Sequence, residues 1–346
     1  MSAPATEALI EAVAVPVLLI GPDQRILGAN SAAAALFGAG LVGRPAPAVM
    51  RHPDFLDGLE RCLAAGAPVA LRLTISAGGA EMRLAVSFRP LAGDAAGRLL
   101  CTIEDLTAAE QALAARRDFL ANVSHELRTP LTALAGFIDT LQGAARDDPA
   151  ARARFLAIME RETSRMSRLV DDLLSLSRVE AEERRRPAAQ VELLGLLRAT
   201  LATHRDAARA AGVALTLEGE EGPLTLRGDA DQLMQVFHNL VENALKYGSS
   251  GGSVTVRVDP PARDPVLKAE AVRVEVIDRG EGIDPLHLPR LTERFYRVDT
   301  HRSRARGGTG LGLAIVKHIV NRHRGRLKIE SEPGRGSRFA VILPLG

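Results

Sequence analysis

The sequence predicts an α+β protein of several domains: a strand-rich N-terminal part, a long helical hairpin and a C-terminal α/β sandwich. Three observations support this fold class. Short apolar runs alternate with turn residues up to about residue 105. Leucines then recur at every seventh position, at 106, 113, 120, 127, 134 and 141. Beyond residue 187, strand-like runs surround helices with one apolar face. We therefore expect three domains, at 1–105, 106–186 and 187–346.

The first domain begins with a strand pair and ends with three more strands. Residues 16–20 and 25–28 read as strands joined by a turn, and Asn30 and Ser31 cap a short helix over 32–37. Strand-like runs follow at 69–76, 82–89 and 98–104. This order, with the run from Ile20 to Ser31, resembles a PAS domain.

A PAS-like domain binds a small ligand or only dimerises, and the residues favour dimerisation. Cys62 and Cys101 lack the context of a flavin-adduct site, so we expect them to fill the core. His52 lies in Arg-His-Pro, a loop-like setting rather than a haem-ligand setting.

Composition excludes several classes of protein. The net charge of +2 gives no electrostatic case for nucleic acid as a partner. The two cysteines form no CxxC pair, so we expect neither a disulfide framework nor a zinc site. The N-terminus lacks the pattern of a signal peptide, and no apolar run reaches the length of a transmembrane helix. These features predict a cytoplasmic chain.

The second domain is predicted as two helices, over about 108–144 and 150–184, with a bend at Gly143 to Pro149. Its second helix carries a narrow apolar stripe: Phe155, Met159, Met166, Leu169, Leu173 and Leu176. One hairpin cannot bury two such stripes, whereas two copies form a four-helix bundle. We therefore expect a homodimer. The alternative is a plain helical spacer.

One histidine of the hairpin stands apart from the leucine seam. With the leucines at heptad position d, His125 falls at position b, so its ring should point to solvent. A neutral imidazole is a nucleophile near neutral pH. The run Phe119 to Leu134, with His-Glu-x-x-Thr-Pro at its centre, resembles the H-box of sensor histidine kinases. The resemblance implies that His125 is the phosphoacceptor. Glu126 would then hold one ring nitrogen and accept its proton, and Thr129 would orient water for dephosphorylation.

The first predicted ligand-binding motif of the third domain is the run Asn239 to Tyr247, which lies on a predicted helix. Asn239, Glu242, Asn243 and Lys246 share one face, which is costly unless it meets a polar ligand. The run resembles the N-box of the GHKL ATPases. The resemblance implies that Asn243 binds Mg²⁺ with Asn239 assisting, that Glu242 positions the γ-phosphate, that Lys246 faces phosphate and that Tyr247 lies near the base.

Glycine-bearing motifs complete the expected nucleotide site. The run Asp278-Arg-Gly-Glu-Gly282 resembles the G1 box, in which the aspartate accepts a hydrogen bond from the adenine amine and Gly280 and Gly282 let the backbone approach the base. Glu293 to Arg297 resembles the F-box, with Phe295 as an anchor and Arg297 beside it. Arg306 to Ile315 resembles the G2 box, whose amides wrap phosphate at the start of a helix. That box contributes Gly307, Gly308, Thr309, Gly310, Leu311 and Gly312.

The segment 298–305 between these boxes is expected to be an ATP lid. Arg302, Arg304 and Arg306 would balance the charge of the triphosphate, although a solvated loop is a close alternative. No Walker motif and no HRD or DFG motif of protein kinases occurs in the sequence.

The whole pattern resembles a sensor histidine kinase of a two-component system. The resemblance implies a GHKL-type domain that binds ATP and Mg²⁺, transfer of the γ-phosphoryl group to His125, and onward transfer to an aspartate of a response regulator. The run Lys317 to Gly325 resembles the phosphate-regulon branch. Two rivals stay open: a clamp-type ATPase, which would lack the H-box, and a PAS-containing scaffold without catalysis, which would lack an intact nucleotide site.

Overall fold

The computed structural model describes residues 8–77, 79–92, 97–183, 185–219, 222–298 and 308–346. The chain forms two compact units, Met1–Asp118 and Phe119–Gly346. The predicted ATP lid, with Arg302, Arg304, Arg306 and Gly307, lies outside the described residues. No helix of the described residues has the length and apolar character needed to cross a bilayer. The three domain boundaries drawn from the sequence stay predictions.

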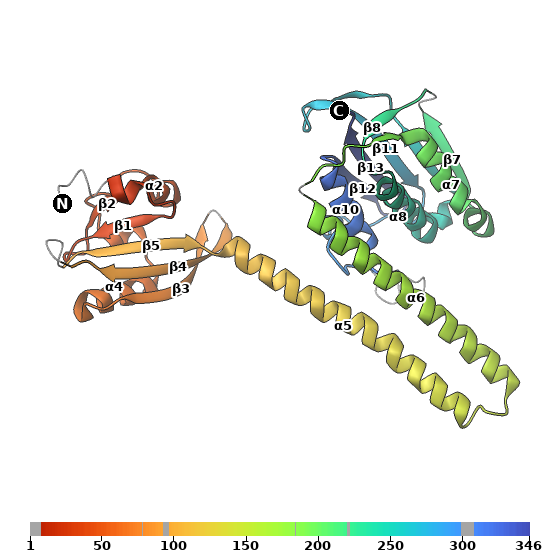
Figure 1. The fold of residues 1–346 in the computed structure, drawn as a ribbon, viewed down its shortest axis with the longest axis horizontal. Helices are drawn as coiled ribbons and strands as arrows, with labels where there is room; N and C mark the ends of the chain where they lie inside the picture. The colour runs from red at the N-terminus through yellow and green to blue at the C-terminus, as the bar shows by residue number, and fades with distance from the viewer. Residues whose placement is uncertain (1–7, 78, 93–96, 184, 220–221, 299–307) are drawn as a thin grey trace. The chain divides into compact units, whose positions relative to one another are not determined.

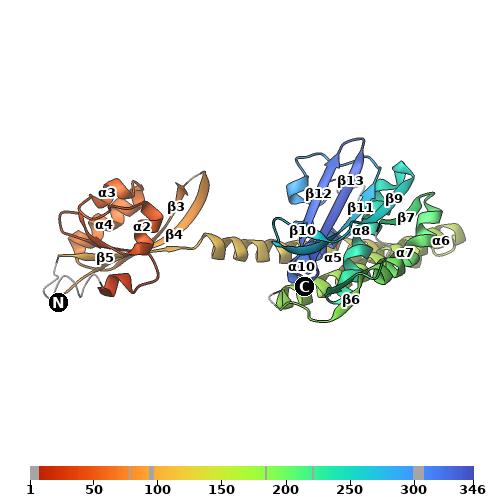
Figure 2. The same ribbon diagram turned by 90° about the horizontal axis from the view of Figure 1, so that it is seen from above.

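The first unit is an antiparallel sheet with three helices on one face and the helical turn 8–11 on the other (Figures 1 and 2). Five strands lie in the order β2-β1-β5-β4-β3: β1 (Val17–Ile20), β2 (Ile26–Ala29), β3 (Val69–Ala77), β4 (Ala80–Pro90) and β5 (Leu99–Asp105). The helices are α2 (Ser31–Phe37), α3 (Ala46–Val49) and α4 (Pro53–Ala65). Every strand and the capped helix expected from the sequence are confirmed, and Asn30 caps α2 by accepting from the Ala33 amide.

Both cysteines lie in the core of this unit, as expected. Cys62 on α4 and Cys101 on β5 have no exposed surface, and burial raises the pKa of both thiols. They pack in the cluster that contains Phe55 and Phe88, whose rings meet edge to face at 5.1 Å. His52 lies in a loop, as expected, where it directly precedes α4 and caps that helix, because its Nδ1 accepts from the Asp54 amide.

The hairpin consists of α5 (Thr107–Gln142) and α6 (Pro149–Glu182), within two residues of the expected ends. Asp148 caps α6 by accepting from the Ala150 and Ala151 amides, and Pro149 occupies the first helical position. Phe137 and Phe155 stack across the two helices at 5.3 Å. Much apolar surface stays open along both helices, at Leu113, Leu120, Leu131, Ile138, Leu156, Val170 and Leu174.

The C-terminal part is a two-layer α/β sandwich (Figure 1). Its main sheet has the order β12-β13-β11-β9-β7, with β10 added on β11. The strands are β7 (Ala214–Gly219), β9 (Ser253–Val258), β10 (Ala262–Asp264), β11 (Ala269–Asp278), β12 (Arg326–Glu332) and β13 (Gly336–Pro344). Helices α7 (Leu193–Ala210), α8 (Ala230–Gly248) and α10 (Gly312–Arg322) cover one face of this sheet.

One expected strand of this sandwich pairs elsewhere. The apolar run near 224–227 predicts a strand of the sandwich, and β8 (Thr225–Arg227) is that strand, but it pairs with β6 (Gln190–Glu192) in a separate two-stranded sheet. Each of these strands is three residues long, too short for a periodic pattern to identify its partner. The segments β6 and β10 were not expected from the sequence, for the same reason.

A buried histidine fastens α10 to the start of α8. His323 has 1% of its surface exposed; its Nε2 accepts from the Asp229 amide at 3.0 Å, and its Nδ1 lies 2.8 Å from the Ile319 carbonyl oxygen, to which it donates. Asp229 in turn caps α8 by accepting from the Gln232 amide. This bonding requires a neutral ring with its proton on Nδ1.

We predict that the protection of α8 and α10 against amide hydrogen exchange falls as the pH drops below about 6.5. Burial lowers the pKa of His323, so the unfolded chain gains a proton at a pH where the folded chain stays neutral. Stability is therefore lost from the unfolded pKa downward until the folded pKa is passed.

His323→Gln should lose protection at pH 7.5 and show a shallower pH dependence, after correction for intrinsic exchange rates. His52→Gln, on α4 of the other unit, is the matched control and should keep the wild-type slope. An unchanged slope in His323→Gln would contradict the prediction.

Candidate functional site

The polar face expected on α8 is present and half-buried. Apolar residues at three- and four-residue steps bury the opposite face against the sheet, from Leu233 to Leu245. The Lys246 Nζ lies 2.8 Å from the Glu242 carboxylate. Burial raises the pKa of Glu242, but the hydrogen bond and charge of Lys246 outweigh it, so the pKa lies below its ordinary value. Asn239 donates to the Gly312 carbonyl at 3.4 Å, and Asn243 is one turn further along.

Asp278 lies at the end of β11 with 6% of its surface exposed. Its Oδ1 accepts from the Gly280 amide at 2.9 Å. Burial raises the pKa of this carboxyl above its ordinary value, while hydrogen bonds from the Gly280 and Ser337 backbones act in the opposite direction. A nearly buried acceptor at a strand end can take a hydrogen bond from a ligand N–H, as the G1 resemblance implies.

Three glycines shape the surroundings of Asp278. A Cβ on Gly280 would lie 2.5 Å from the Gly248 Cα, and one on Gly248 would collide with the Asp278 side chain. Gly282 has φ of +70° and faces the Glu332 carbonyl, which leaves no room for a side chain. Gly248, the last residue of α8, was missed in the sequence, where it looked like an ordinary helix end. Its demand for a bare Cα arises from β11, thirty residues later in the chain.

Residues 308–312, which we call the glycine loop, contact both the F-box and α8. Gly310 has φ of +76°, and a Cβ there would come within 2.9 Å of the Phe295 Cα. The Phe295 amide donates to the Gly310 carbonyl at 2.8 Å. Leu311 is fully buried and precedes α10, while Gly312 lies beside Asn239. The N-box, the G1 aspartate and the described part of the G2 box therefore gather in one region of the sandwich.

The F-box residues turn toward the hairpin. Phe295, in the left-handed region at φ of +64°, packs its ring 5.8 Å from that of Phe119 on α5. The Arg294 guanidinium lies over the same Phe119 ring at 5.3 Å. Tyr247 keeps 42% of its surface exposed at the end of α8. The role of Phe295 in anchoring the ATP lid stays a prediction, and its contact with Phe119 was not indicated by the sequence.

His125 is exposed on α5, as its heptad position predicted. Thr129 lies one turn further along and donates its hydroxyl to the His125 carbonyl oxygen at 3.1 Å. Glu126 was expected to hydrogen-bond the ring of His125. Its carboxylate instead accepts from Arg165 of α6 at 2.5 Å and from Arg297 at 3.3 Å.

Arg297 connects the hairpin, which carries His125, to the predicted nucleotide site. Its side chain is only 5% exposed, and besides Glu126 it donates to the Gly308 carbonyl at 2.6 Å. The last residue of the F-box run thus contacts both Glu126, the neighbour of His125, and Gly308 of the glycine loop. Arg165 and Asp172 of α6 belong to the same region and were missed, because the sequence shows them only as charges on a helix with many charges.

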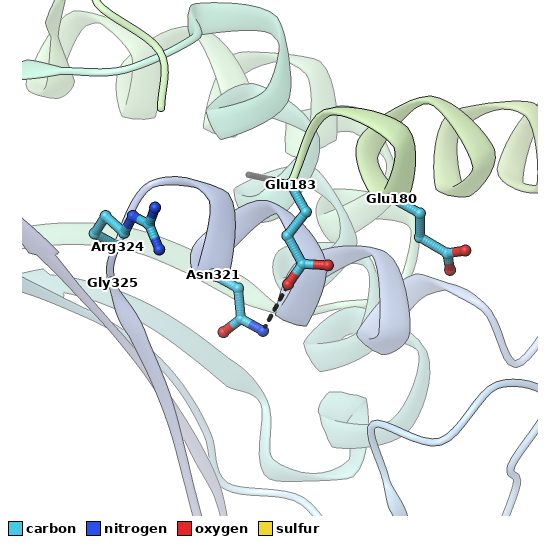
Figure 3. A pocket seen from close by; sticks show the side chains of 5 residues that line it. All are labelled: Glu180, Glu183, Asn321, Arg324 and Gly325. Carbon is cyan, nitrogen blue, oxygen red and sulfur yellow. Dashed lines mark hydrogen bonds between the residues drawn. The ribbon is translucent and has the colours of Figure 1, made fainter. Parts of the chain in front are cut away.

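A separate hollow of about 570 Å³ lies between the end of α6 and α10 (Figure 3). Its lining is polar and consists of Glu180, Glu183, Asn321, Arg324 and Gly325. Asn321 donates to Glu183 at 3.3 Å. None of the site residues expected from the sequence lines this hollow, so its size does not identify the site.

The side-chain oxygens near Asn243 suit a metal ion that binds together with a phosphate-bearing ligand. Among the described residues, no group of three or more histidine, cysteine, aspartate or glutamate side chains could hold a metal ion. Magnesium, however, binds through few protein oxygens and keeps waters and phosphate oxygens. The amide oxygens of Asn243 and Asn239 beside Glu242 fit that kind of site.

Three family models match the chain in sequence order. A PAS domain matches residues 6–69, a His Kinase A (phospho-acceptor) domain matches 115–182, and the histidine kinase-, DNA gyrase B- and HSP90-like ATPase matches 228–346. The PAS match contains the run Ile20 to Ser31, and the other two contain the H-box run and the nucleotide-binding boxes, so the PAS, hairpin and GHKL parts of the expected fold are confirmed.

Curated relatives agree with this order. The phosphate regulon sensor protein PhoR of Pseudomonas aeruginosa is 42% identical over 69% of this chain and 52% of its own length. The sensor-like histidine kinase SenX3 of Mycolicibacterium smegmatis is 37% identical over 70% of this chain and 61% of its own length. The chain therefore spans little more than half the length of these relatives.

A solved structure, the histidine kinase ThkA in complex with the response regulator protein TrrA, matches with a TM-score of 0.52, 22% identity and 98% coverage of both chains. This likeness concerns the fold alone. Because the phospho-acceptor and ATPase models follow a PAS domain in one chain that also aligns with curated sensor kinases, the chain belongs to the sensor histidine kinases.

Proposed function

We propose that this chain is an ATP-dependent protein histidine kinase that phosphorylates His125 and passes the phosphoryl group to an aspartate of a response regulator. One observation carries the proposal. The polar face of α8, Asp278 and the glycine loop gather at one place, and Arg297 joins that place to Glu126, next to the exposed His125.

The nucleotide is assigned to the region around α8. Asp278 accepts a hydrogen bond from the adenine amine, with Gly280 and Gly282 close to the base and Tyr247 at its edge. The Asn243 amide oxygen, assisted by Asn239, would hold a magnesium ion, which would supply positive charge to stabilise the phosphates. Lys246 and Arg297 offset phosphate charge, and Glu242 positions the γ-phosphate. The run Gly308, Thr309, Gly310, Leu311 and Gly312 supplies amides at the start of α10.

The transfer itself is a substitution at phosphorus. One imidazole nitrogen of His125 attacks the γ-phosphorus, the bond to the bridging oxygen of ADP breaks, and ADP leaves. The proton on the other ring nitrogen passes to Glu126. Since the Glu126 carboxylate is bound by Arg165 and Arg297 here, transfer requires it to change partners. In the reverse direction, Thr129 orients a water that attacks the phosphoaspartate of the regulator. The reaction belongs in the cytoplasm, where Mg-ATP is abundant.

The hairpin is assigned to dimerisation. Leu120, Leu131 and Ile138 occupy the a and d positions of the heptad on α5 and have 57%, 53% and 42% of their surfaces exposed. An apolar seam this open is covered when two hairpins form a four-helix bundle.

The first prediction of this proposal is acid-labile, alkali-stable labelling of the chain by γ-³²P-ATP and Mg²⁺. His125→Gln should abolish the label, because the glutamine amide is not a nucleophile. His52→Gln should keep it. Free phosphate without labelled protein would favour the clamp-type ATPase, and no turnover of bound ATP would favour the scaffold.

The second prediction concerns Gly248. In Gly248→Ala the new methyl group collides with Asp278, and overpacking costs about 1–3 kcal/mol. ATP affinity should fall on the order of tenfold or more, as measured by calorimetry. Gly136→Ala, an exposed glycine inside α5 with open space around it, is the matched control and should bind ATP normally. Normal binding by Gly248→Ala would remove Asp278 from the assigned role.

The third prediction concerns the seam. Ile138→Glu should raise the dimer dissociation constant by roughly a hundredfold, because each dimer would bury two unpaired carboxylates at several kcal/mol of cost. Thr132→Glu adds the same charge at an exposed b position and should leave the dimer intact. Sedimentation velocity over a range of concentrations measures both. A monomeric wild type, or equal effects of the two variants, would contradict dimerisation through this seam.

A further inference from the structure

The glycine loop is bonded to the hairpin helix α6. The Thr309 hydroxyl donates to the Asp172 carboxylate at 2.6 Å. The same hydroxyl oxygen accepts from the Leu311 amide at 3.3 Å, so one side chain connects α6 to the start of α10. Thr309 lies among the residues that are assigned to phosphate, whereas Asp172 belongs to a helix with no assigned part in nucleotide binding.

The Asp172 carboxylate lies among groups that are expected to bind phosphate, Thr309 and Lys246. It is half-buried, and burial followed by the nearby Glu242 carboxylate raises its pKa, while the Thr309 hydroxyl, Lys246 and Arg168 lower it. The groups that stabilise its charge thus include Lys246 and Thr309, two of those expected to stabilise a triphosphate. Because the Asp172 and Glu242 carboxylates already lie close together, both would repel a further negative charge at this place.

A second bond fixes the loop in the same arrangement. Arg297 donates to the Gly308 carbonyl and to Glu126 of α5 from a nearly buried position. A third contact lies further along α6, where Ser175 donates to Gln235 of α8 at 2.8 Å. Adjacent residues of the loop, Gly308 and Thr309, are therefore both tied to the hairpin, one to each helix.

We propose that Asp172 is an internal competitor of the nucleotide, whose carboxylate occupies the phosphate-binding loop when α6 lies against α8 and leaves it when ATP binds. The inference rests on the proposed ATP site and adds a device that regulates it. Thr309 cannot donate its single hydroxyl proton both to Asp172 and to a phosphate oxygen. Two states therefore exclude each other: the hairpin-bound loop and the nucleotide-bound loop.

The consequence is a coupling between the hairpin and nucleotide affinity. The apparent affinity for ATP is the intrinsic affinity reduced by the fraction of chains whose loop is free. Whatever moves α6 away from α8 raises that fraction. Conversely, ATP favours the arrangement in which the hairpin has released the loop.

The test measures Mg-ATP binding by calorimetry on the full chain with Asp172→Asn and Asp172→Ala. Both variants should bind ATP roughly tenfold tighter than wild type, the size expected from losing a competing hydrogen bond to a charged group. Adenosine, which lacks phosphates, should bind all variants equally. Asp171→Asn removes the same charge from the adjacent, exposed position of α6 and should behave as wild type.

Equal ATP affinities for wild type and both Asp172 variants would overturn the inference while leaving the proposed function standing. Weaker ATP binding by Asp172→Asn would overturn it as well, since the carboxylate would then support the site. Tighter binding that Asp171→Asn shares would identify bulk charge as the cause and also overturn it. Failure of every variant, wild type included, to bind ATP would overturn the proposed function itself.

Discussion

The close approach of α8 to β11 is the constraint on which the site depends. The apolar face of α8 is buried against the sheet, and the helix ends with Gly248 in contact with Asp278. This packing leaves Asn239, Glu242, Asn243 and Lys246 on the face away from the core. The desolvation of Asp278 and the presentation of the polar face therefore have one cause, and a shift of α8 would disturb both.

Patterns that repeat within a few residues could be predicted from the sequence, and contacts between distant elements could not. The heptad placed His125 on the exposed side of α5, and helical spacing placed Asn239 and Lys246 on one face. The requirement for glycine at position 248 was missed because Asp278, the residue that packs against it, lies on another element. Asp172 and Arg165 were missed because a charged residue on a helix gives no sign of its partner. The strand 225–227 was predicted, but its pairing with β6 was not, because three residues carry no register.

The hairpin and the sandwich share an apolar core and also meet through charged pairs: Leu169, Leu176 and Val179 of α6 are buried in one cluster with residues of the sandwich. Charged pairs between the two parts include Glu126 with Arg297, Arg294 with Glu180 at 2.6 Å, and Arg322 with Glu182 at 2.7 Å. Such pairs contribute modest net free energy because each exchanges hydration for a partner. Opening this contact exposes the buried apolar residues of α6 to water, at about 25 cal/mol for each Å² of apolar surface. In the proposed function, any movement of the nucleotide site toward His125 on the hairpin has to offset this cost.

The burial of both cysteines has a practical consequence for following that motion. Thiols with raised pKa and no exposed surface react slowly with maleimides and disulfide reagents. The two native cysteines would therefore take up little label when the chain is labelled at other positions. Single reporter thiols introduced at exposed positions of the stalk and the sandwich would carry spin labels or dyes without prior removal of the native ones. Distances between such labels would follow the stalk and the ATPase domain directly in solution.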